Sequence, residues 1–557
     1  MTNRRVSRQF RAVVGILLAL ALVTAACSNK SDSTTKAETG TTVAGTKDTT
    51  TGTTAPKSDF NQPDQEGTPQ DGGSISIGVE SQTATLDPAG ALAQPSDIDM
   101  ALAIYDSLIA YDPQGKLIPN LATKWENSPD LKTWTITVKT GIKFQDGTDF
   151  NAEAVQKQFE RFLDPATKCA CKDQVAQIVS VKATNPTTVV FVLDKPNAFW
   201  SSTLAGTLGF IASPTATAKY GADYARHPVG TGPFALPDYD SQILKKNPTY
   251  WKKDDNGVQL PYLSSIKIVP IADAQVLLTS LQSGDVDMIQ TADTGTIVDV
   301  LKSGTKDLKV QKVTGTSSTI VLFNTKKAPF DDVRIRQAFA YAMNRVEINN
   351  VQYQGSRQEA YGPFPTDSTY YVKTDAPHYD VAKAKALVAA AKADGKPTSF
   401  TAVCIPTAES RKILGLIKQQ MATVGMTMTN EFLDQGALVN KVLTKTGDYE
   451  ASCFRGPQIA NADGLYNSLY TNGASNATFY TNPKVDAALD DIRATSDAAK
   501  QVDDLHVVQT EIARDVPTIP ILFDLFGNIY SSKISGLPAP EPWSLGAIKL
   551  ATLYLKK

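Results

Sequence analysis

The chain has 557 residues, a formal net charge of −2 and only three histidines. Charge this close to balance provides no basic surface, which argues against nucleic acid as a partner. The histidines, His227, His378 and His506, occur without an HExxH motif or a Cys/His pairing at zinc spacing. Neither a metal site nor a cofactor is therefore expected.

Residues 1–26 have the pattern of an export signal. A basic start precedes the uncharged run Val13–Val23, which is too short for a comfortable membrane span, and two alanines follow. Because Cys27 comes next, the segment resembles a bacterial lipoprotein signal peptide, in which that thiol receives diacylglycerol. Thr24 departs from the Leu or Val usual there, and the alternative is an ordinary signal with an incidental cysteine. The export route, general secretory or twin-arginine, stays open.

Residues 27–72 are predicted to be a disordered, Ser/Thr-rich tether. They are mainly Ser, Thr, Gly, Lys and Asp, and Phe60 is their only aromatic residue. Such a segment buries too little apolar surface to order itself. A lipid on Cys27 and a solvated tether would hold the rest of the chain at the extracytoplasmic face of the cell membrane. The sequence leaves glycosylation of the tether open.

The remainder of the chain is long enough for roughly three domain-sized units, or two large lobes. Alternating apolar residues predict strands at 73–79, 134–138, 189–193 and 266–268. No second apolar run approaches the ~20 residues of a membrane-spanning helix.

After about residue 324, helical and strand patterns alternate. A helix is predicted over 331–348, capped by Asp331 or Asp332, and another over 413–425, ended by Gly425. Strands are predicted at 398–406, 426–434 and 448–455. This order implies parallel pairing with right-handed crossovers, and thus one open α/β lobe of about 200 residues.

Four cysteines remain besides Cys27, an even number that in an exported protein favours disulfides. Cys404 and Cys453 lie in two predicted strands that a parallel sheet would place side by side, so we predict a disulfide between them; two buried thiols are the alternative. Cys169 and Cys171 share a loop and form either a small disulfide or two free thiols.

Three motifs that suggest chemistry are better explained as structure. Residues 230–235 (GTGPFA) spell a dinucleotide fingerprint, but Pro233 removes an amide that phosphates need, so we expect a turn. Residues 254–257 lack the glutamate that closes a calcium loop. Asp285 and Asp287 are expected to cap a helix or face solvent. No residue is predicted to be catalytic.

An ordered set of motifs carries a family resemblance. The motifs are Tyr105-Asp106-x-Leu108, Pro119-x-Leu121-Ala122-x-x-Trp125, Lys143-Phe144-x-Asp146-Gly147, HPVGTGPF at 227–234, Asn247-Pro248-x-Tyr250-Trp251, LQSGDVD at 281–287, the stretch 323–338, Asn482-Pro483-x-Val485-Asp486 and Pro517-Thr518-Ile519-Pro520. Together they resemble the extracytoplasmic solute-binding proteins of family 5, the oligopeptide, dipeptide and nickel receptors of ABC importers. The likeness covers nearly everything from residue 73 onward. Most of these residues suit turns and packing rather than ligand contact.

The resemblance implies an α/β, two-lobe periplasmic-binding-protein-like fold, of type II and of the large peptide-binding variant with an extra subdomain. Lobe I would comprise residues 73–95, 226–322 and 525–557, the subdomain residues 96–225, and lobe II residues 323–524. The crossings are expected near Phe323–Asn324 and Asp524–Asn528. A solute would be enclosed between the lobes by hinge closure.

The implied function is a monomeric receptor that captures a small solute, peptide-like or another oligomeric or anionic compound. It would deliver that solute to the permease subunits of an ABC transporter and would not be an enzyme. One alternative is a membrane-anchored hydrolase of peptides or wall fragments, which needs a nucleophile with its base, or a metal. Another is an adhesion or signalling module on the same fold.

The candidate ligand-binding residues begin with Phe454 and Arg455, at the carboxyl end of the strand at 448–455, where ligands of open α/β sheets bind. The resemblance implies a Trp in this region and, three residues later, an Asp for a peptide amino terminus. Here Pro457 or Gln458 stands at the second place, and Asp463, which we include as a candidate acid for the solute, comes several residues late.

A solute presenting a carboxylate, a phosphate or sugar hydroxyls is therefore expected, with Arg455 as a planar clamp and Phe454 as a stacking surface. Tyr361 and Phe364 would add aromatic walls, and Gln82 and Thr83 would face them from lobe I. The alternative is that Arg455 pairs with a neighbouring acid.

Overall fold

The computed structural model describes residues 64–92, 94–304, 306–444, 447–456 and 458–556. The predicted signal peptide, Cys27 and most of the predicted tether lie outside the described residues. The last part of that tether, residues 64–72, is attached to the fold. The Asp64 carboxylate accepts hydrogen bonds from Lys309 Nζ at 3.0 Å and from the Tyr530 hydroxyl at 2.9 Å. These partners are far away in sequence, so composition alone does not reveal the attachment.

Ten strands form one mixed sheet in the order β14-β13-β15-β12-β16-β11-β1-β10-β9-β8. Their bounds, in that order, are Thr427–Phe432, Ser399–Cys404, Ala451–Arg455, Leu308–Phe323, Thr518–Ser531, Met288–Thr291, Ser74–Val79, Ser265–Pro270, Ile243–Lys246 and Phe234–Ala235. The strand–helix–strand prediction for the second half is confirmed, because β13 pairs in parallel with β14 and with β15.

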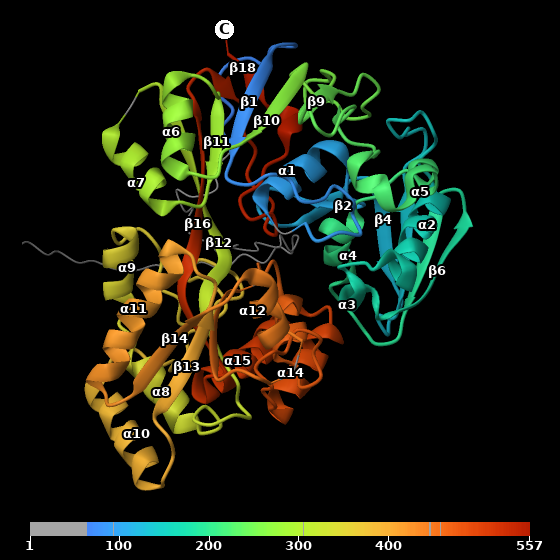
Figure 1. Cartoon of the computed structure of the whole chain (residues 1–557). Coiled ribbons are helices and arrows are strands. Elements are labelled where there is room, and N and C mark those ends of the chain that lie inside the picture. The colour runs from blue at the N-terminus through green and yellow to red at the C-terminus, as the bar shows by residue number, and fades with distance from the viewer. Residues whose placement is uncertain (1–63, 93, 305, 445–446, 457, 557) are drawn as a thin grey trace, which may run out of the picture. The chain divides into compact units, whose positions relative to one another are not determined.

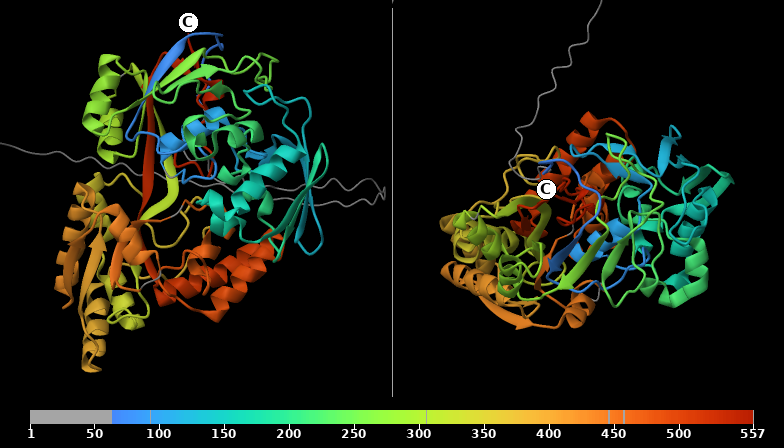
Figure 2. Two further views of the ribbon diagram at one scale, coloured as in Figure 1. Left: turned by 45° about the vertical axis from the view of Figure 1, so that its right-hand side comes forward. Right: turned by 90° about the horizontal axis from the view of Figure 1, so that it is seen from above.

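The two longest strands, β12 and β16, run antiparallel through the middle of this sheet (Figures 1 and 2). Their pairing is regular from Leu308 to Thr314 and resumes at Ser318, and the register breaks between these two positions. On one side of the pair lie β13, β14 and β15, and on the other side lie β11, β1 and β10. The two strands therefore connect both halves of the sheet.

A second, four-stranded antiparallel sheet has the order β4-β5-β7-β6, with bounds Ala122–Asn127, Thr133–Val138, Thr188–Leu193 and Ile178–Asn185. Two-stranded pairs join β2 (Ile109–Tyr111) to β3 (Leu117–Pro119) and β17 (Ile534–Ser535) to β18 (Tyr554–Leu555). Trp134 and Ile136, predicted from their alternation, are buried in the core beneath the four-stranded sheet.

The α-helices surround these sheets (Figure 1). They are α1 (Pro95–Ile104), α2 (Ala152–Leu163), α3 (Lys172–Val175), α4 (Trp200–Thr203), α5 (Pro214–Tyr220), α6 (Ala274–Ser283), α7 (Thr294–Ser303), α8 (Val333–Ala342), α9 (Arg345–Tyr353), α10 (Val381–Ala393), α11 (Ala408–Thr423), α12 (Gln435–Val442), α13 (Tyr466–Leu469), α14 (Pro483–Arg493) and α15 (Ala498–Asp515). Short 3₁₀ helices lie at Pro165–Thr167, Thr207–Gly209, Gly221–Arg226, Ala462–Leu465 and Leu550–Thr552.

The prediction of a single helix over 331–348 is wrong, because the chain forms two helices there, α8 and α9. Asp332 caps α8 as predicted, but Met343 is extended and Asn344 starts a new helix by accepting a hydrogen bond from the Glu347 amide. Asparagine is a strong N-cap residue, and here this local preference interrupts the apolar periodicity. The predicted end of α11 is confirmed, since Gly425 follows it in the left-handed conformation, with φ of +85°.

The GTGPF segment lies against the end of α1 rather than forming an isolated turn. The Gly232 amide donates to the Ile104 carbonyl at 2.9 Å. A Cβ atom on Gly232 would lie 2.5 Å from the Ile104 carbonyl carbon, and one on Gly230 would lie 2.2 Å from the Ile104 oxygen. Both positions therefore require glycine because the two backbones approach so closely.

Motifs distant in sequence meet at one buried carboxylate. Asp106 accepts hydrogen bonds from Trp251 Nε1 at 2.8 Å, Lys252 Nζ at 2.9 Å, the Tyr250 hydroxyl at 3.1 Å and the Thr231 hydroxyl at 3.3 Å. The side chain is 6% exposed. These residues hold the loop after α1 to the segment that precedes β8 and to the segment that follows β9, so their role is structural.

Contrary to the expectation, Asp287 does not simply face solvent. Its carboxylate accepts from both the backbone amide and the hydroxyl of Ser76, each at 2.8 Å. It thereby fixes the start of β1.

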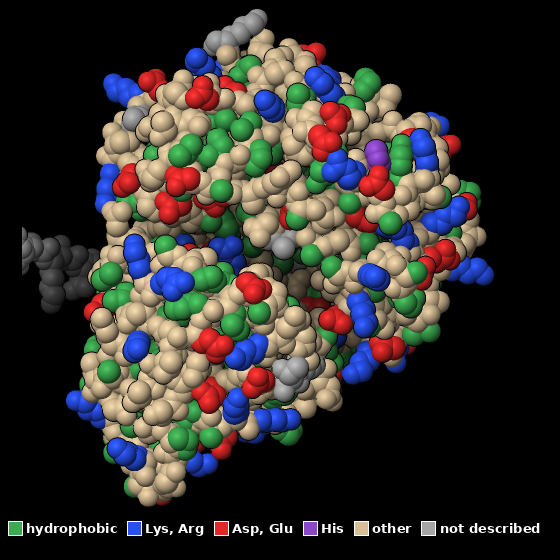
Figure 3. Space-filling model, in the orientation of Figure 1, with side chains coloured by type: hydrophobic (Ala, Val, Ile, Leu, Met, Phe, Trp, Pro, Cys, Tyr) green, Lys and Arg blue, Asp and Glu red, His purple; other side chains and the backbone are tan. Residues whose placement is uncertain are grey.

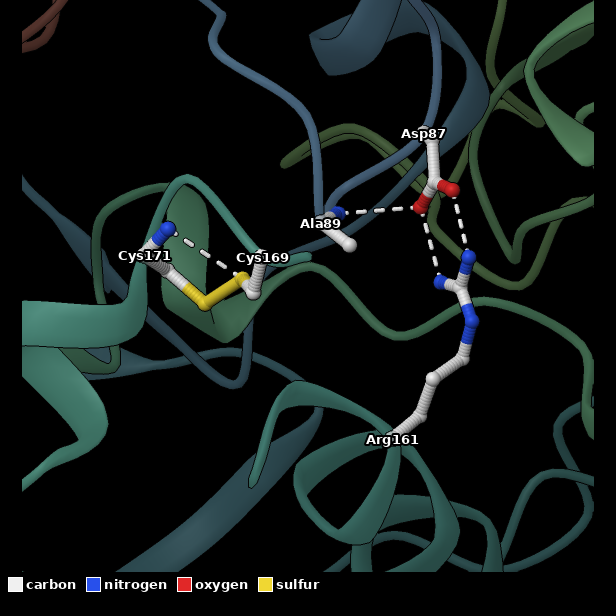
Figure 4. Close-up of a disulfide and its surroundings, with 5 residues drawn as sticks. All are labelled: Asp87, Ala89, Arg161, Cys169 and Cys171. Atoms are coloured by element: carbon white, nitrogen blue, oxygen red, sulfur yellow. Dashed lines mark hydrogen bonds and ion pairs between the residues drawn. A yellow bond between two sulfur atoms is a disulfide. The ribbon is translucent and has the colours of Figure 1, made fainter. Parts of the chain in front are cut away.

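Two disulfides are present in the structure. Cys404 and Cys453 lie on the neighbouring strands β13 and β15, with Cα atoms 5.2 Å apart. Cys169 and Cys171 are joined within their loop, where the Cys171 amide also donates to Cys169 Sγ at 3.2 Å (Figure 4). This loop leads directly into α3.

Candidate functional site

A cavity of about 830 Å³ lies beside the central strands. Its wall combines residues of β12, β15 and β16, the loop 361–377, α3 and the segment 202–208, and Trp543 and Leu545 near the end of the chain. The face drawn in Figure 3 is hollowed near its middle, and acidic and basic side chains are interspersed over it. This volume is typical of a small-molecule site, which usually encloses 300–1,000 Å³.

Phe454 and Arg455 both line this cavity, at the carboxyl end of β15. Arg455 Nε lies 3.2 Å from Asp524 Oδ2, and the arginine side chain is 48% exposed. Asp524 is buried and also accepts from the Ser317 hydroxyl at 2.6 Å and from Arg357 Nη1 at 3.3 Å. Arg455 is therefore both a lining residue and the partner of a neighbouring acid, with part of its guanidinium left open to the cavity.

Asp463 also lines the cavity but is already paired. Its two carboxylate oxygens accept from Arg493 Nε at 2.5 Å and from Arg493 Nη2 at 3.2 Å. The Arg493 guanidinium lies 3.4 Å from the centre of the Tyr466 ring. Asp463 therefore positions Arg493 here, which differs from the expectation of an acid available to the solute.

Of the two predicted aromatic walls, only Tyr361 lines the cavity. Its ring stacks on His378, with centroids 4.0 Å apart. Phe364 is 2% exposed, packs against Tyr370 and belongs to a hydrophobic core, whereas Pro363 reaches the cavity. Because burying the larger apolar surface is more favourable, Phe364 rather than Pro363 enters the core.

Gln82 and Thr83 do not line the cavity. Gln82 is exposed, and Thr83 is buried with its carbonyl accepting from the Tyr239 hydroxyl at 3.1 Å. The chain after β1 turns away because the Ala84 amide donates to Asp97 Oδ1 of α1 at 2.7 Å.

The sequence interpretation missed Arg345, which lines the cavity and is 3% exposed. Its Nε donates to the Pro520 carbonyl at 3.0 Å and its guanidinium lies 4.5 Å from the centre of the Tyr361 ring. Burial lowers the pKa of Arg345 to about 10, opposed by the charges of Tyr361 and Glu359. The sequence offered one signal for Arg345, which is its position directly after the capping residue Asn344. The prediction of one continuous helix led us to overlook this signal.

Trp543, Tyr111 and Asp173 also line the cavity and were not predicted. Trp543 packs edge-on against Phe210, with ring centroids 5.9 Å apart. Asp173 lies on α3, next to the Cys169–Cys171 loop.

One contact joins the segment before α4 to α14 beside the cavity. The Ala198 amide donates to the Arg493 carbonyl at 2.8 Å, and Phe199 packs into the core formed by Phe364, Tyr466 and their neighbours. Arg493 also lines the cavity, so this contact lies next to the cavity wall.

Over the described ranges, no three His, Cys, Asp or Glu side chains gather in a group suited to a metal ion. Within the same ranges, no helix has the length and hydropathy to cross a membrane.

Comparison with known proteins identifies the fold and the family. The family model described as "Bacterial extracellular solute-binding proteins, family 5 Middle" matches residues 116–477. The glutathione-binding protein GsiB of Shigella flexneri is 29% identical over 478 residues, which cover 83% of this chain and 91% of GsiB. GsiB of Escherichia coli (strain K12) matches with the same identity and coverage.

Solved structures share the architecture. The PBP AgaA from A. tumefacien R10, in complex with agropinic acid, superposes with a TM-score of 0.75 at 25% identity, covering 87% of this chain and 99% of AgaA. The periplasmic binding protein DppA from Helicobacter pylori, in complex with a peptide, has a TM-score of 0.74 at 23% identity over 88% of this chain and 99% of DppA. The latter likeness shows the fold alone, which is the two-lobe α/β periplasmic-binding-protein fold of type II.

Because the family model spans most of the chain and the relatives cover it almost throughout, the protein belongs to the bacterial extracellular solute-binding proteins of family 5, the receptors that capture a solute and deliver it to the permease of an ABC importer.

Proposed function

We propose that the cavity beside β15 is the solute site and that the solute is a small, peptide-like or other compound with an acidic group. The observation that carries this proposal is the position of Arg455, half exposed at the carboxyl end of a sheet strand and on the cavity wall. Ligands of open α/β sheets bind at this edge. Glutathione, the ligand named for the GsiB relatives, has this chemistry and fits the volume.

We also propose that the receptor acts as a monomer and without catalysis, and the relatives, which are named for binding, support the second part of this proposal. The domain limits remain those predicted from the sequence. One observation refines them: Ile98 to Tyr105, assigned to the subdomain, pack in the same core as β1 and β10.

Replacing Arg455 by alanine should weaken glutathione binding at least tenfold, about 1.4 kcal/mol, in titration calorimetry. The melting temperature of solute-free protein should hardly change, because Asp524 keeps its bonds from Ser317 and Arg357. Lysine at 455 should recover only part of the affinity, since it lacks the planar fork.

The matched control is Arg514→Ala, which removes a similarly exposed, acid-paired arginine that does not line the cavity. It should leave affinity unchanged. Full affinity in Arg455→Ala would place the clamp elsewhere, and a parallel loss of affinity and stability would make Arg455 a structural residue.

We also propose that a lipid on Cys27 anchors the protein to the membrane. Replacing Cys27 by serine should release soluble protein from the membrane fraction or leave the precursor uncut, because serine cannot accept the thioether-linked lipid. Fractionation and immunoblotting measure both outcomes, and Ser28→Ala should behave like the wild type. Unchanged processing and membrane retention in Cys27→Ser would contradict lipidation.

A further inference from the structure

Arg345 is a buried cation whose hydrogen bonding is incomplete. Its Nη1 atom has no hydrogen-bond partner among the described residues, although the residue is 3% exposed. Glu359 is the acid whose charge acts on the pKa of Arg345. Its carboxylate instead accepts a hydrogen bond from Asn349 Nδ2 at 3.0 Å. A buried guanidinium without a bonded counter-charge costs several kcal/mol, and such groups concentrate at functional sites.

A second buried arginine in the same part of the fold shows what a structural arginine looks like. Arg336 of α8 is 7% exposed, and it donates from Nε to the Asp515 carbonyl at 2.8 Å and from Nη1 to the Phe330 carbonyl at 2.7 Å. Arg336 does not line the cavity, whereas Arg345 does. The incomplete bonding of Arg345 is therefore not a general property of buried arginines here.

The pairing of the strands gives the distance between the two backbone positions at which Arg345 and Arg455 are anchored. Arg345 is tied to Pro520 of β16, and Arg455 follows Phe454 of β15. Pro520 and Phe454 both pair with Ile320 of β12, on opposite sides of it. Since adjacent strands lie about 4.8 Å apart, the two points are about 10 Å apart.

We propose that Arg345 binds an oxyanion of the solute, in the first instance a carboxylate, at a second subsite of the cavity. The inference rests on the proposed function and narrows its solute class. The favoured solute therefore has two acidic groups, one directed to each arginine. The Tyr361 ring, whose centre lies 4.5 Å from the guanidinium, helps to hold it in place.

The first experiment needs no solute. Wild type, Arg345→Met and Arg336→Met are unfolded, refolded to remove bound molecules, and compared by thermal denaturation. Arg345→Met should melt at the same temperature as wild type or higher, because an unpaired buried charge is removed. Arg336→Met should melt lower, because two backbone carbonyls lose their donor. If Arg345→Met melts as low as Arg336→Met, Arg345 is structural and the proposal is overturned.

The second experiment measures discrimination between ligands by calorimetry. The probes are glutathione, glutathione diethyl ester and inorganic phosphate. The wild type and Arg336→Met should prefer glutathione to the ester at least tenfold. Arg345→Met should keep only the part of that preference that Arg455 supplies, and Arg345→Lys should be intermediate. Undiminished preference in Arg345→Met overturns the subsite.

Phosphate binding that is lost in Arg345→Met would assign the subsite to phosphate rather than carboxylate. Binding of no probe by the wild type would contradict the proposed solute class, and the comparison of melting temperatures would still decide the role of Arg345. The two failures are therefore distinguishable.

Discussion

Replacing Asp106 by alanine is expected to lower the free energy of unfolding by about 3–5 kcal/mol, the usual cost of leaving a buried charge without its partner. Lys252 donates to this carboxylate at 2.9 Å, and burial lowers the pKa of Lys252 while the Asp106 charge opposes that shift. Without Asp106, the ammonium and the donors of Tyr250 and Trp251 lose their acceptor. Urea denaturation at pH 7 measures the loss.

A surface pair provides the matched control. Asp149 and Lys143 lie 2.6 Å apart with side chains 66% and 50% exposed, so Asp149→Ala should cost less than about 1 kcal/mol. The double variant Asp106→Leu with Lys252→Met should recover part of the lost stability, since it removes both charges. A loss in Asp106→Ala no larger than that in Asp149→Ala would show that the cluster contributes little.

Replacing Asp99 by asparagine should flatten the dependence of stability on pH. Asp99 is 3% exposed and accepts from the Ile548 amide at 2.8 Å. Burial raises its pKa from 3.8 to about 8, against the opposing effect of the Ile548 and Gln290 hydrogen bonds. Between about pH 4 and pH 8 the folded protein therefore holds a proton that the unfolded chain has released.

Over this window, stability should fall as pH rises, by up to about 1.4 kcal/mol per pH unit. Denaturation at pH 5, 6, 7 and 8 should show a shallower slope for Asp99→Asn and a greater stability than wild type at pH 8. Asp332→Asn is the opposite control, because hydrogen bonds from Arg334 lower the pKa of Asp332, so its stabilisation is lost only as pH falls below about 4. Identical slopes in wild type and Asp99→Asn would show that Asp99 stays ionised.

Seven of the strands, β1, β5, β7, β10, β13, β14 and β15, could be predicted because their signal is local, whereas the two longest, β12 and β16, were not assigned. Alternation identified β5 and β7, and the order of strand, helix and strand fixed the parallel pairing of β13 with β14. The division between α8 and α9 was not predicted, because the capping preference of one asparagine prevailed over a longer apolar pattern.

The candidate residues that line the cavity were found where a local rule applies. Phe454 and Arg455 follow from the rule on strand ends, and they line the cavity. Phe364 was misplaced because sequence does not reveal which of two adjacent apolar residues enters a core. Arg345 was missed because its burial depends on Pro520 and Tyr361, which lie far from it in the chain.

The register between β12 and β16 shifts twice within a short stretch, between Thr314 and Ser318 and between Thr319 and Ile320, and irregular pairing of this kind lets a sheet bend. On each side of this stretch the two strands are paired, and within it the Ser317 amide donates to Gln458 Oε1 and the Thr316 hydroxyl accepts from the Ile459 amide. Two paired strands resist sliding and shearing, so bending about an axis across them is the motion that this stretch would allow most easily. Thr316 and Ser318 border the cavity, so a solute bound there would lie next to that axis. A small displacement there would be amplified by leverage into a larger movement at distant edges of the sheet.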